Sequence, residues 1–364
     1  MQKITKIVLT GGPCAGKSTA MSWIQNAFTA RGFKVLFVPE TATELITGGV
    51  APWTCGTNLD YQTCQMRLQK EKESIFLTAA NTMPDKKILI VCDRGMMDNR
   101  VYMTDDEFQI VLGRINETEV AIRDDYDAVF HLMSAANGAP GIYLKNKEKN
   151  PARIETVEQA VELDNKLISA WTGHPHLRVI DNSTGFEDKM KRLISEIAGF
   201  LGAPELCEIE RKFLIEYPDV KMLEERPNCK KVEIIQTYLK AGDHEEVRVR
   251  QRGTDGSYIY FKTIKKKVTD ATRVEIEERI SQEEYLKLLM EADTSLHQIR
   301  KTRYCLTNEG RYFEIDLYPF WSDKAIMEVA LLNEAQEAEI PDFLKIIKEV
   351  TGDDAYKNAS LAKL

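Results

Sequence analysis

The sequence lacks the features of a membrane-spanning or secreted protein. No apolar run approaches the roughly 20 residues that a membrane-spanning helix needs. The N-terminal residues Met1–Gly12 contain neither a long apolar stretch nor the small-residue cleavage site of a secretory signal. With 43% hydrophobic and 29% charged residues, the composition is typical of a soluble globular protein. We therefore expect a cytoplasmic protein with no transmembrane segment, for which peripheral membrane contact stays open.

Paired metal ligands and paired cysteines are also missing. The seven cysteines are scattered singly, which argues against a disulfide framework and a structural zinc site. His174 and His176 stand close together but have no third ligand nearby, so we expect a turn there. The net charge of −8 disfavours broad binding to nucleic acid. A small polyanion remains a suitable ligand for local basic clusters.

The hydrophobic pattern of the sequence changes near the middle of the chain. Short apolar runs alternate with helical patterns in the first half, which predicts an α/β P-loop NTPase fold, a parallel sheet with helices on both faces. The runs are residues 7–10, 35–38, 88–92, 128–132 and 177–180. A last amphipathic helix, capped by Ser183 or Thr184, ends before Pro204. We therefore expect two domains, residues 1–204 and 205–364.

Alternation of period two predominates in the second half. It predicts a mainly antiparallel β tunnel or barrel domain with flanking helices. The clearest strand segments are residues 208–214, 246–252, 274–280 and 312–317. The flanking helices are expected near residues 283–291 and 342–350.

A phosphate-binding loop is the most specific motif. It reads Gly11, Gly12, Pro13, Cys14, Ala15, Gly16, Lys17, Ser18 and Thr19, and it matches GxxxxGK[ST] between a strand and a helix. Backbone N–H groups of such a loop, with the positive end of the following helix, surround a phosphate. Lys17 would reach the terminal phosphates, and Ser18 would ligate Mg²⁺. The motif predicts binding of a nucleoside triphosphate with magnesium.

Two acids follow other strands of the same predicted sheet. Asp93 directly follows residues 88–92, at the edge where it can bind the magnesium or its waters. Glu40 comes after Pro39, which stops residues 35–38. It can take the proton of a hydroxyl that accepts the phosphoryl group. Alternatively, Asp93 is structural and Glu40 is only a favourable charge at a helix N-terminus.

The segment 143–153 is basic and poor in helix-forming pattern. It fits a lid that closes over phosphates, with Arg153 as the residue that reaches them. A solvated loop would have the same composition. Both interpretations stay open.

Motifs spread over residues 4–202 make the first half similar to a known family. They read GGPCAGKST, VPETATELI, CDRG, SAANGAP, AWTGHPH and VIDNST. Through them the chain resembles the P-loop kinase-like family shared by ribosylnicotinamide kinases and the TRPL translocation defect protein 14 group. The resemblance implies ATP or GTP bound with Mg²⁺, and residues 181–184 near the base. The choice of base stays open.

Charges of both signs alternate with apolar residues in the second half. Glu208, Glu210 and Lys212 share one strand face, and similar patterns occur at Arg248 and Arg250, Glu275 and Glu277, Lys301 and Arg303, and Glu314 and Asp316. Turned inward in a barrel, such faces would bind a polyphosphate through their bases and divalent cations through their acids. A solvated face would show the same pattern on any one strand.

Several of these segments resemble the CYTH domain, the fold of the triphosphate tunnel metalloenzymes. They read EIERKFL, VRVRQR, YFKTIKK, RVEIEERI, IRKTRY and FEID, within residues 206–364. The resemblance implies triphosphate hydrolysis or cyclisation with Mg²⁺ or Mn²⁺. It assigns the metal to Glu208, Glu210, Glu275, Glu277, Glu314, Asp316 and Glu328, and the phosphates to Lys212, Arg248, Arg250, Lys262, Lys301 and Arg303. An expected late Glu-x-Glu reads Glu328-Val329-Ala330, so metal binding and turnover are expected to be weaker.

Two functions are therefore compatible with the sequence. In the first, the P-loop domain transfers or hydrolyses phosphate from Mg·NTP, and the CYTH-like domain binds or hydrolyses a triphosphate. In the second, the protein is a GTP-regulated trafficking or adaptor protein with little or no catalysis, which binds an anionic headgroup such as a phosphoinositide. Glu40 and the basic segment 143–153 favour the first function, and Glu328-Val329-Ala330 favours the second.

Overall fold

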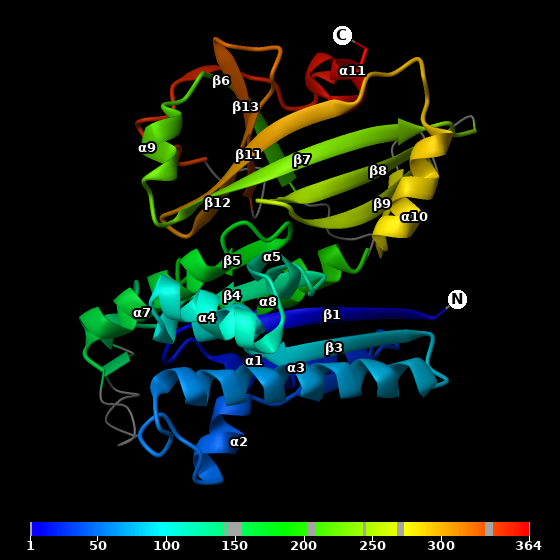
Figure 1. Ribbon diagram of the computed structural model, residues 1–364. Helices are drawn as coiled ribbons and strands as arrows, with labels where there is room; N and C mark the ends of the chain where they lie inside the picture. Colours follow the sequence, from blue (N-terminus) through cyan, green and yellow to red (C-terminus); the bar gives the residue numbers. More distant parts are fainter. Residues whose placement is uncertain are drawn as a thin grey trace. The chain divides into compact units, whose positions relative to one another are not determined.

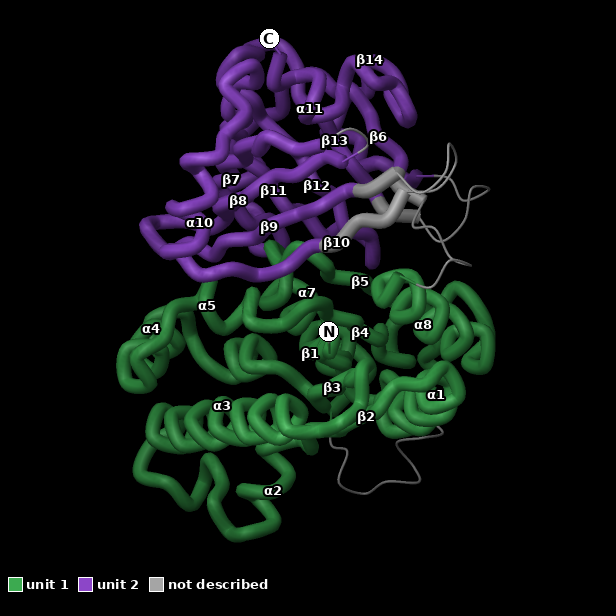
Figure 2. The backbone as a smooth tube through the Cα atoms, turned by 90° about the vertical axis from the view of Figure 1, so that its right-hand side faces the viewer, with its two compact units in different colours: residues 1–206 green, residues 207–364 purple. Residues whose placement is uncertain are grey.

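The computed structural model describes residues 2–141, 143–144, 155–202, 209–242, 245–267, 273–331 and 338–363. The chain divides into two compact units, residues 1–206 and 207–364 (Figure 2). The boundary expected after residue 204 falls within residues 203–208, which lie outside the described residues. Each unit is described by itself below.

Unit 1 is built on a five-stranded parallel sheet with the strand order β2-β3-β1-β4-β5. The strands are β1 (Lys3–Thr10), β2 (Lys34–Val38), β3 (Lys87–Asp93), β4 (Ala128–Leu132) and β5 (Leu177–Ile180). The expected α/β fold is confirmed. The strands read as apolar runs because helices cover both faces of the sheet. β1 is the central strand, with β3 and β2 on one side of it and β4 and β5 on the other. The loop after β1 therefore lies at a topological switch point.

Helices cover the two faces of this sheet in separate groups. On one face, α1 (Lys17–Thr29) and α8 (Phe186–Phe200) share an apolar core with the strands (Figure 2). On the other, the long helix α3 (Asn58–Thr82) contacts β2, β3 and the 3₁₀ helix η1 (Met96–Tyr102). The remaining helices are α2 (Thr41–Thr47), α4 (Asp105–Ile115), α5 (Glu119–Arg123) and α7 (Val157–Trp171).

The start of α8 differs from the sequence prediction. Its N-cap residue is Gly185, which has no side chain to cap the helix. Ser183 instead donates its hydroxyl hydrogen bond to Asp181 at 2.6 Å, so the predicted cap by Ser183 or Thr184 is wrong. The Ser183 hydroxyl binds the nearby carboxylate of Asp181 and not the N-terminus of α8.

Unit 2 contains a nine-stranded sheet with the order β10-β9-β8-β7-β11-β12-β13-β6-β14. Figure 1 shows this sheet curled rather than flat. The strands are β6 (Ile209–Glu216), β7 (Cys229–Leu239), β8 (Glu245–Thr254), β9 (Ser257–Lys267), β10 (Arg273–Ile280), β11 (Ile299–Asn308), β12 (Arg311–Leu317), β13 (Lys324–Leu331) and β14 (Ile346–Glu349). All paired strands are antiparallel, which confirms the predicted class.

Short helices flank this sheet. They are α9 (Val220–Glu224), α10 (Gln282–Leu288), η2 (Leu289–Glu291), η3 (Asp354–Tyr356) and α11 (Asn358–Leu361). The helix expected near residues 283–291 corresponds to α10 and η2. The helix expected at residues 342–350 is wrong, because β14 lies there and pairs with β6. Edge pairing accounts for this: the backbone N–H of Val350 donates to the carbonyl of Lys212 at 2.8 Å, and such tertiary contacts override local propensity.

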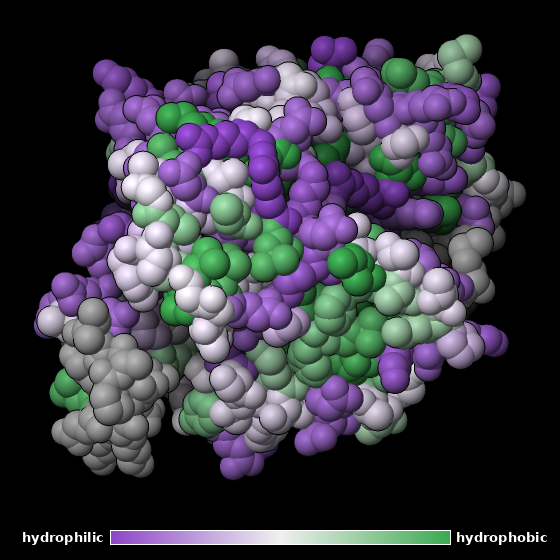
Figure 3. Space-filling view, turned by 60° about the horizontal axis from the view of Figure 1, so that its bottom comes forward, coloured by the Kyte–Doolittle hydropathy of each residue, from purple (hydrophilic) through white to green (hydrophobic). Residues whose placement is uncertain are grey.

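The described helices include none that is both long enough and apolar enough to span a bilayer. On the face drawn in Figure 3, apolar residues form patches among polar ones.

Candidate phosphate-binding sites

The phosphate loop, residues 11–16, joins β1 to α1 and depends on its glycines. Gly11 has φ 146°, and a Cβ placed there would lie 2.2 Å from the carbonyl oxygen of Leu132. A Cβ at Gly12 would lie 2.7 Å from Oδ1 of Asp164. Only glycine fits such close approaches. Ser18 and Thr19 are exposed in the first turn of α1, where a phosphate-bound ligand can reach them.

A buried carboxylate holds this loop from behind. Asp164 of α7 is fully buried, and it accepts hydrogen bonds from the N–H of Gly12 at 2.8 Å and the N–H of Ser134 at 3.0 Å. Nε2 of His131 lies 3.0 Å from the same carboxylate. Burial alone would raise the pKa of Asp164, but His131 and the two N–H donors lower it. The hydroxyl of Ser134 also donates to the carbonyl of Pro13 at 2.5 Å.

A buried lysine links the loop to two further segments. Nζ of Lys189 in α8 donates to the carbonyl of Met133 at 2.6 Å and to Oδ1 of Asn182 at 2.8 Å, and it lies 3.4 Å from the carbonyl of Ala15. Burial lowers the pKa of Lys189 to about 8. Nδ2 of Asn182 donates in turn to the carbonyls of Ser134 and Asn137. The segment 181–184, which the resemblance places near the base, is thereby tied to the phosphate loop.

Charged groups surround Lys17, the first residue of α1. Burial lowers the pKa of Lys17 to about 8, and the nearby guanidinium of Arg94 acts in the same direction. The carboxylates of Asp93 and Glu40 oppose this effect. The structure therefore brings together Lys17, Asp93 and Glu40, which the sequence predicted as partners, and adds Arg94.

Glu40 and Arg94 form an ion pair beside Lys17. Oε1 of Glu40 lies 2.5 Å from Nε of Arg94, and the hydroxyl of Thr43 donates to Oε2 at 2.7 Å. Burial alone would raise the pKa of Glu40, but Arg94, Thr43 and Lys17 lower it. Glu40 is the N-cap residue of α2, yet its side chain makes no capping hydrogen bond. Its carboxylate therefore contacts Arg94 and the Thr43 hydroxyl rather than the backbone N–H groups at the start of the helix.

Asp93 has an oxygen suited to a divalent cation. Oδ1 of Asp93 is buried and has no hydrogen-bond partner among the described residues. Burial raises the pKa of Asp93, and Lys17 partly offsets this. Groups of three or more His, Cys, Asp or Glu ligands are absent from the described part of the chain. Mg²⁺ needs no such group, because it is usually held by one or two protein oxygens together with phosphates and water. Asp93 and Ser18 fit that role.

Most of the basic segment lies outside the described residues. Residues 142 and 145–154 belong to that part, so the prediction for Arg153 and the lid stays a prediction. Tyr143 is fully buried and packs with Ala135, Ala136 and Ala160.

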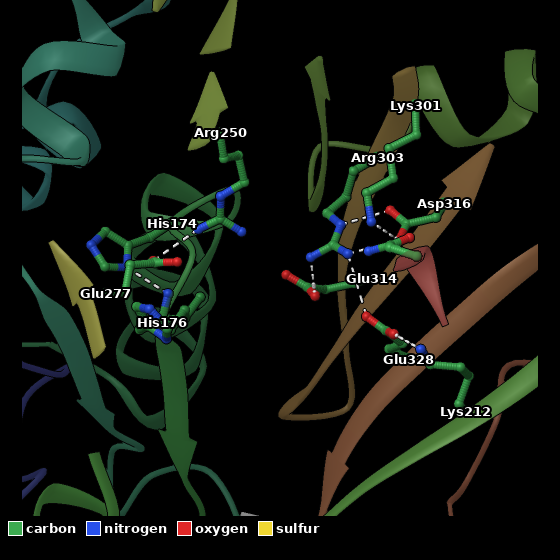
Figure 4. Close-up of polar contacts among 12 residues, drawn as sticks. His174, His176, Lys212, Arg250, Glu277, Lys301, Arg303, Glu314, Asp316 and Glu328 are labelled. Carbon is green, nitrogen blue, oxygen red and sulfur yellow. Dashed lines mark hydrogen bonds and ion pairs between the residues drawn. The ribbon is translucent and has the colours of Figure 1, made fainter. Parts of the chain in front are cut away.

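The two histidines form a turn. Nε2 of His174 lies 3.0 Å from the carbonyl of Tyr126, and the backbone N–H of His176 donates to Nδ1 of His174 at 3.0 Å (Figure 4). Backbone groups thus occupy both ring nitrogens of His174, which leaves no lone pair for a metal.

In unit 2, strand register places acids and bases on one face of the sheet. Directly paired residues share a face, and the pairing connects neighbouring strands from β6 to β10. The charged residues that share this face, and whose side chains are described, are Lys212, Glu216, Lys230, Glu246, Arg248, Arg250, Arg252, Lys265, Glu277, Arg279, Lys301, Arg303, Glu314, Asp316, Lys324 and Glu328. We call it the charged face. The sequence did not single out Arg252 or Lys265, although both continue the alternation of their strands.

The register corrects the expectation for Lys262. This residue pairs with Val249 and Glu278, so it lies on the opposite face from Arg248 and Arg250. Strand alternation is strict, and a shift of one position reverses the face. Glu208 lies outside the described residues, as do the side chains of Glu210 and Glu275, so their predicted roles stay predictions.

Arg303 is the centre of an ion-pair network on the charged face (Figure 4). Its Nε and Nη2 each lie 2.7 Å from an oxygen of Asp316. It also pairs with Glu314 and, at 3.3 Å, with Glu328. Nζ of Lys301 lies 2.5 Å from Asp316. Burial alone would raise the pKa of Asp316, but Arg303 and Lys301 lower it strongly.

A second ion pair lies on β8 and β10 of the same face. Nη2 of Arg250 lies 2.8 Å from Oε1 of Glu277, and Thr263 donates its hydroxyl hydrogen bond to Oε2 at 2.9 Å. Burial lowers the pKa of Arg250, and Arg248, Arg252 and Arg303 add to this. Cations from β8 and β11 therefore lie near one another, as binding of a polyanion requires.

Glu328, which lacks the second acid that the resemblance expects beside it, also has cationic partners. Oε1 of Glu328 lies 2.6 Å from Nζ of Lys212, and Arg303 is its second partner. Ala330, which stands where the resemblance expects a second acid, pairs across the strands with Glu210.

Substitution of the carboxylate behind the phosphate loop should weaken nucleotide binding. In Asp164→Asn, an amide N–H must face the N–H of Gly12 or Ser134, so the loop loses one of its hydrogen bonds. We expect affinity for Mg·ATP to fall about tenfold, or about 1.4 kcal/mol, as measured by calorimetric titration. Glu162→Gln removes an exposed charge from the same helix and should bind as wild type does. Wild-type affinity in Asp164→Asn would contradict the role of Asp164.

Removal of the central acid of the charged face should destabilise unit 2. Asp316→Asn leaves Lys301 and Arg303 buried with less compensation, and breaking such a pair costs about 3–5 kcal/mol. We expect hydrogen exchange in β11 and β12 to accelerate accordingly in the full chain. Glu349→Gln, which breaks an exposed pair with Arg211, should cost under about 1 kcal/mol. An equal loss of stability in Asp316→Asn and Glu349→Gln would show that burial of the ion pair does not determine its contribution to stability.

Three similar solved structures each match a part of this chain. The inorganic triphosphatase NE1496 is 32% identical, and the match covers 44% of this chain and 96% of that protein with a TM-score of 0.32. The PH1012 protein from Pyrococcus horikoshii OT3 is 22% identical, with 35% and 80% covered and a TM-score of 0.27. The putative adenylyl cyclase HpAC1 from Hippeastrum, described as having a dominant triphosphatase activity, is 16% identical, with 34% and 80% covered and a TM-score of 0.24. A comparison with curated proteins found no match.

Family models match both units. The CYTH domain matches residues 206–352, which hold every charged-face residue. The AAA domain matches residues 6–189, just over half of the chain, including the phosphate loop, Glu40, Asp93 and Asp164. The chain therefore belongs to the AAA domain family and carries a CYTH domain behind its P-loop domain.

Proposed function

We propose that unit 1 binds a nucleoside triphosphate with Mg²⁺ and transfers its terminal phosphoryl group to a small acceptor or to water. The observation that carries this proposal is the grouping of Lys17, Asp93 and the Glu40–Arg94 pair beside the phosphate loop. A nucleotide-binding switch has no need of a carboxylate and a guanidinium held there as a pair. The motifs shared with ribosylnicotinamide kinases support a small-molecule kinase.

Different residues have different roles in the proposed phosphoryl transfer. Loop N–H groups and Lys17 bind the phosphates, and Asp93 and Ser18 hold the magnesium, which when bound neutralises charge on the phosphate oxygens. Glu40 is held by Arg94 with a lowered pKa, so it orients the attacking hydroxyl or water better than it removes a proton. In a loose transition state the nucleophile needs little deprotonation, so orientation suffices.

We propose that the CYTH domain binds a triphosphate through the cations of the charged face and hydrolyses it. The 32% identity to a protein described as an inorganic triphosphatase supports this. A divalent cation fits less well at Glu277, Glu314, Asp316 and Glu328, the predicted metal ligands whose side chains are described, because each faces a lysine or arginine. We therefore assign no step to a metal in this unit.

Binding without turnover is the second candidate for the CYTH domain. The observation that favours it is Glu328, whose neighbours are Lys212 and Arg303, together with Ala330 in place of a second acid. A charged face of this kind would still hold an anionic headgroup such as a phosphoinositide.

Phosphate release from ATP, GTP and inorganic triphosphate separates these functions. Lys17→Ala should lower release from ATP or GTP by about 100-fold, since it removes a cation from the developing charge, and should leave release from inorganic triphosphate unchanged. Arg250→Ala should lower release from inorganic triphosphate and should leave release from ATP or GTP unchanged. Lys166→Ala, on an exposed face of α7, is the control and should match wild type.

The outcomes assign activity to one unit or to neither. Equal loss from both substrates in one variant would contradict independent sites. No release from any substrate, with tight nucleotide binding and headgroup-specific binding to phosphoinositide vesicles, would replace the enzymatic proposal by the adaptor function.

Nucleotide affinity should also depend on the charge of Lys17. Its lowered pKa of about 8 means that the ligand-free protein loses this positive charge as pH rises through 8. The Kd for Mg·ATP should therefore rise about fivefold between pH 8 and pH 9. Calorimetry in buffers of different ionisation enthalpy would detect the proton taken up on binding. Lys17→Arg keeps its charge, and an equal pH dependence in that variant would contradict the assignment to Lys17.

A further inference from the structure

Asp98, the third residue of the 3₁₀ helix η1, accepts hydrogen bonds from three separate parts of unit 1. Its Oδ1 accepts from the hydroxyl of Thr10 at 2.7 Å and from the indole N–H of Trp171 at 2.8 Å. Its Oδ2 accepts from the backbone N–H of Gly95 at 3.0 Å. Asp98 is 2% exposed. A carboxylate is costly to bury unless strong hydrogen bonds compensate it, and here three donors do so.

Two of these donors belong to the elements that hold the phosphate loop. Thr10 is the last residue of β1 and directly precedes the loop. Trp171 is the last residue of α7, and Asp164 lies two turns before it on the same face of that helix. Asp164 accepts from the N–H of Gly12. Asp98 is therefore connected both to the strand that enters the loop and to the helix that supports the loop from behind.

The third donor belongs to the turn that follows β3. Arg94 has φ 70°, a left-handed conformation that a residue with a side chain rarely adopts and that neighbouring contacts must maintain. Its N–H donates to the carbonyl of Leu9 at 3.1 Å, and the next N–H, that of Gly95, donates to Asp98. A Cβ at Gly95 would lie 2.6 Å from the ring of Trp171. The turn is thus fixed by Asp98 and by the indole that Asp98 holds.

The negative charge of Asp98 also acts on the cations of the site. Burial alone would lower the pKa of Arg94, but Tyr102 and then Asp98 raise it. Burial and Arg94 lower the pKa of Lys17, and Asp98 is among the carboxylates that oppose this. Because its hydrogen bonds go to protein groups and its side chain is buried, Asp98 affects a bound nucleotide only through its neighbours.

We propose that Asp98 is a positioning residue, which keeps Asp93 and Arg94 at a fixed distance from the phosphate loop. The proposal rests on the phosphoryl transfer proposed for unit 1, in which Asp93 holds the magnesium and Arg94 holds Glu40. Without the contacts of Asp98, the turn after β3 would move relative to the loop. A displacement of about 1 Å is enough to lower a catalytic rate about 100-fold.

Asp98→Asn tests this role in the full chain. The amide oxygen can still accept from Thr10 and Trp171, but the amide N–H groups then face the N–H of Gly95, so the turn loses its hydrogen bond. Calorimetric titration should give an unchanged Kd for ATP in EDTA, because the phosphate loop keeps its contacts. The Kd for Mg·ATP should rise about tenfold, as the loss of a contact behind a metal ligand typically causes. Phosphate release from Mg·ATP should slow about 100-fold.

A double-mutant cycle separates a positioning role from a structural one. If Asp98 acts through Arg94, then Asp98→Asn should slow phosphate release less than about threefold once Arg94 is replaced by alanine. A merely structural role would lower the melting temperature and slow release by the same factor in both backgrounds. Trp171→Phe removes the indole N–H and keeps an aromatic ring. It should have the same pattern, and it serves as the test if Asp98→Asn does not fold.

Asp105→Asn is the matched control. It neutralises an exposed carboxylate just after η1, which pairs with Arg100, and it should match wild type in both titrations and in the rate. A folded Asp98→Asn variant with the wild-type Kd for Mg·ATP would overturn the positioning role, as would an equal factor in the two backgrounds of the cycle.

The proposed function and the positioning role fail in different ways. If wild type releases no phosphate from Mg·ATP and transfers none, phosphoryl transfer by unit 1 is wrong. The Kd values with and without Mg²⁺ need no turnover, so they still decide whether Asp98 positions Asp93. If wild type turns over Mg·ATP and Asp98→Asn does so equally well, the function stands and the positioning role is wrong.

Discussion

A charge that leaves water must meet an opposite charge or strong hydrogen bonds, and both units are arranged around this constraint. In unit 1, Asp164 is fully buried and is stabilised by two backbone N–H groups and His131. In unit 2, Arg303 and Lys301 neutralise Asp316. At Asp93 and Arg94 an opposite charge lies nearby, yet Oδ1 of Asp93 and Nη1 of Arg94 are buried without a hydrogen-bond partner among the described residues. Compensated charges thus support the fold of both units.

The phosphate loop illustrates how such support serves binding. Gly12, Pro13 and Ala15 each contact a buried side chain from another element: Asp164, Ser134 and Lys189, respectively. These contacts fix the loop before any ligand arrives. Donors that are already oriented lose less entropy on binding and need no rearrangement when charge develops. Since Asn182 joins the same network, the segment expected near the base is fixed together with the loop.

Sequence alone could predict what depends on local spacing. The five strands of unit 1, the phosphate loop and the antiparallel character of unit 2 all follow from short-range patterns. Asp164 could not be predicted, because its partner Gly12 lies 152 residues away and no motif links them. Lys262 was placed on the wrong face, because a difference of one residue in register reverses every side chain of a strand. The helix expected at residues 342–350 is a strand, because β6 offers an edge there that local pattern does not reveal.

The two sites should select their phosphate ligands in different ways. The phosphate loop offers further backbone N–H groups besides that of Gly12, which Asp164 already binds, so even a few phosphate oxygens gain from binding there. On the charged face, Arg303, Lys301 and Arg250 already contact carboxylates. A phosphate that binds one of these cations replaces an existing ion pair, and the gain for each contact is small. A ligand must therefore contact several cations at once to bind well, which favours a chain of phosphates over a single phosphate.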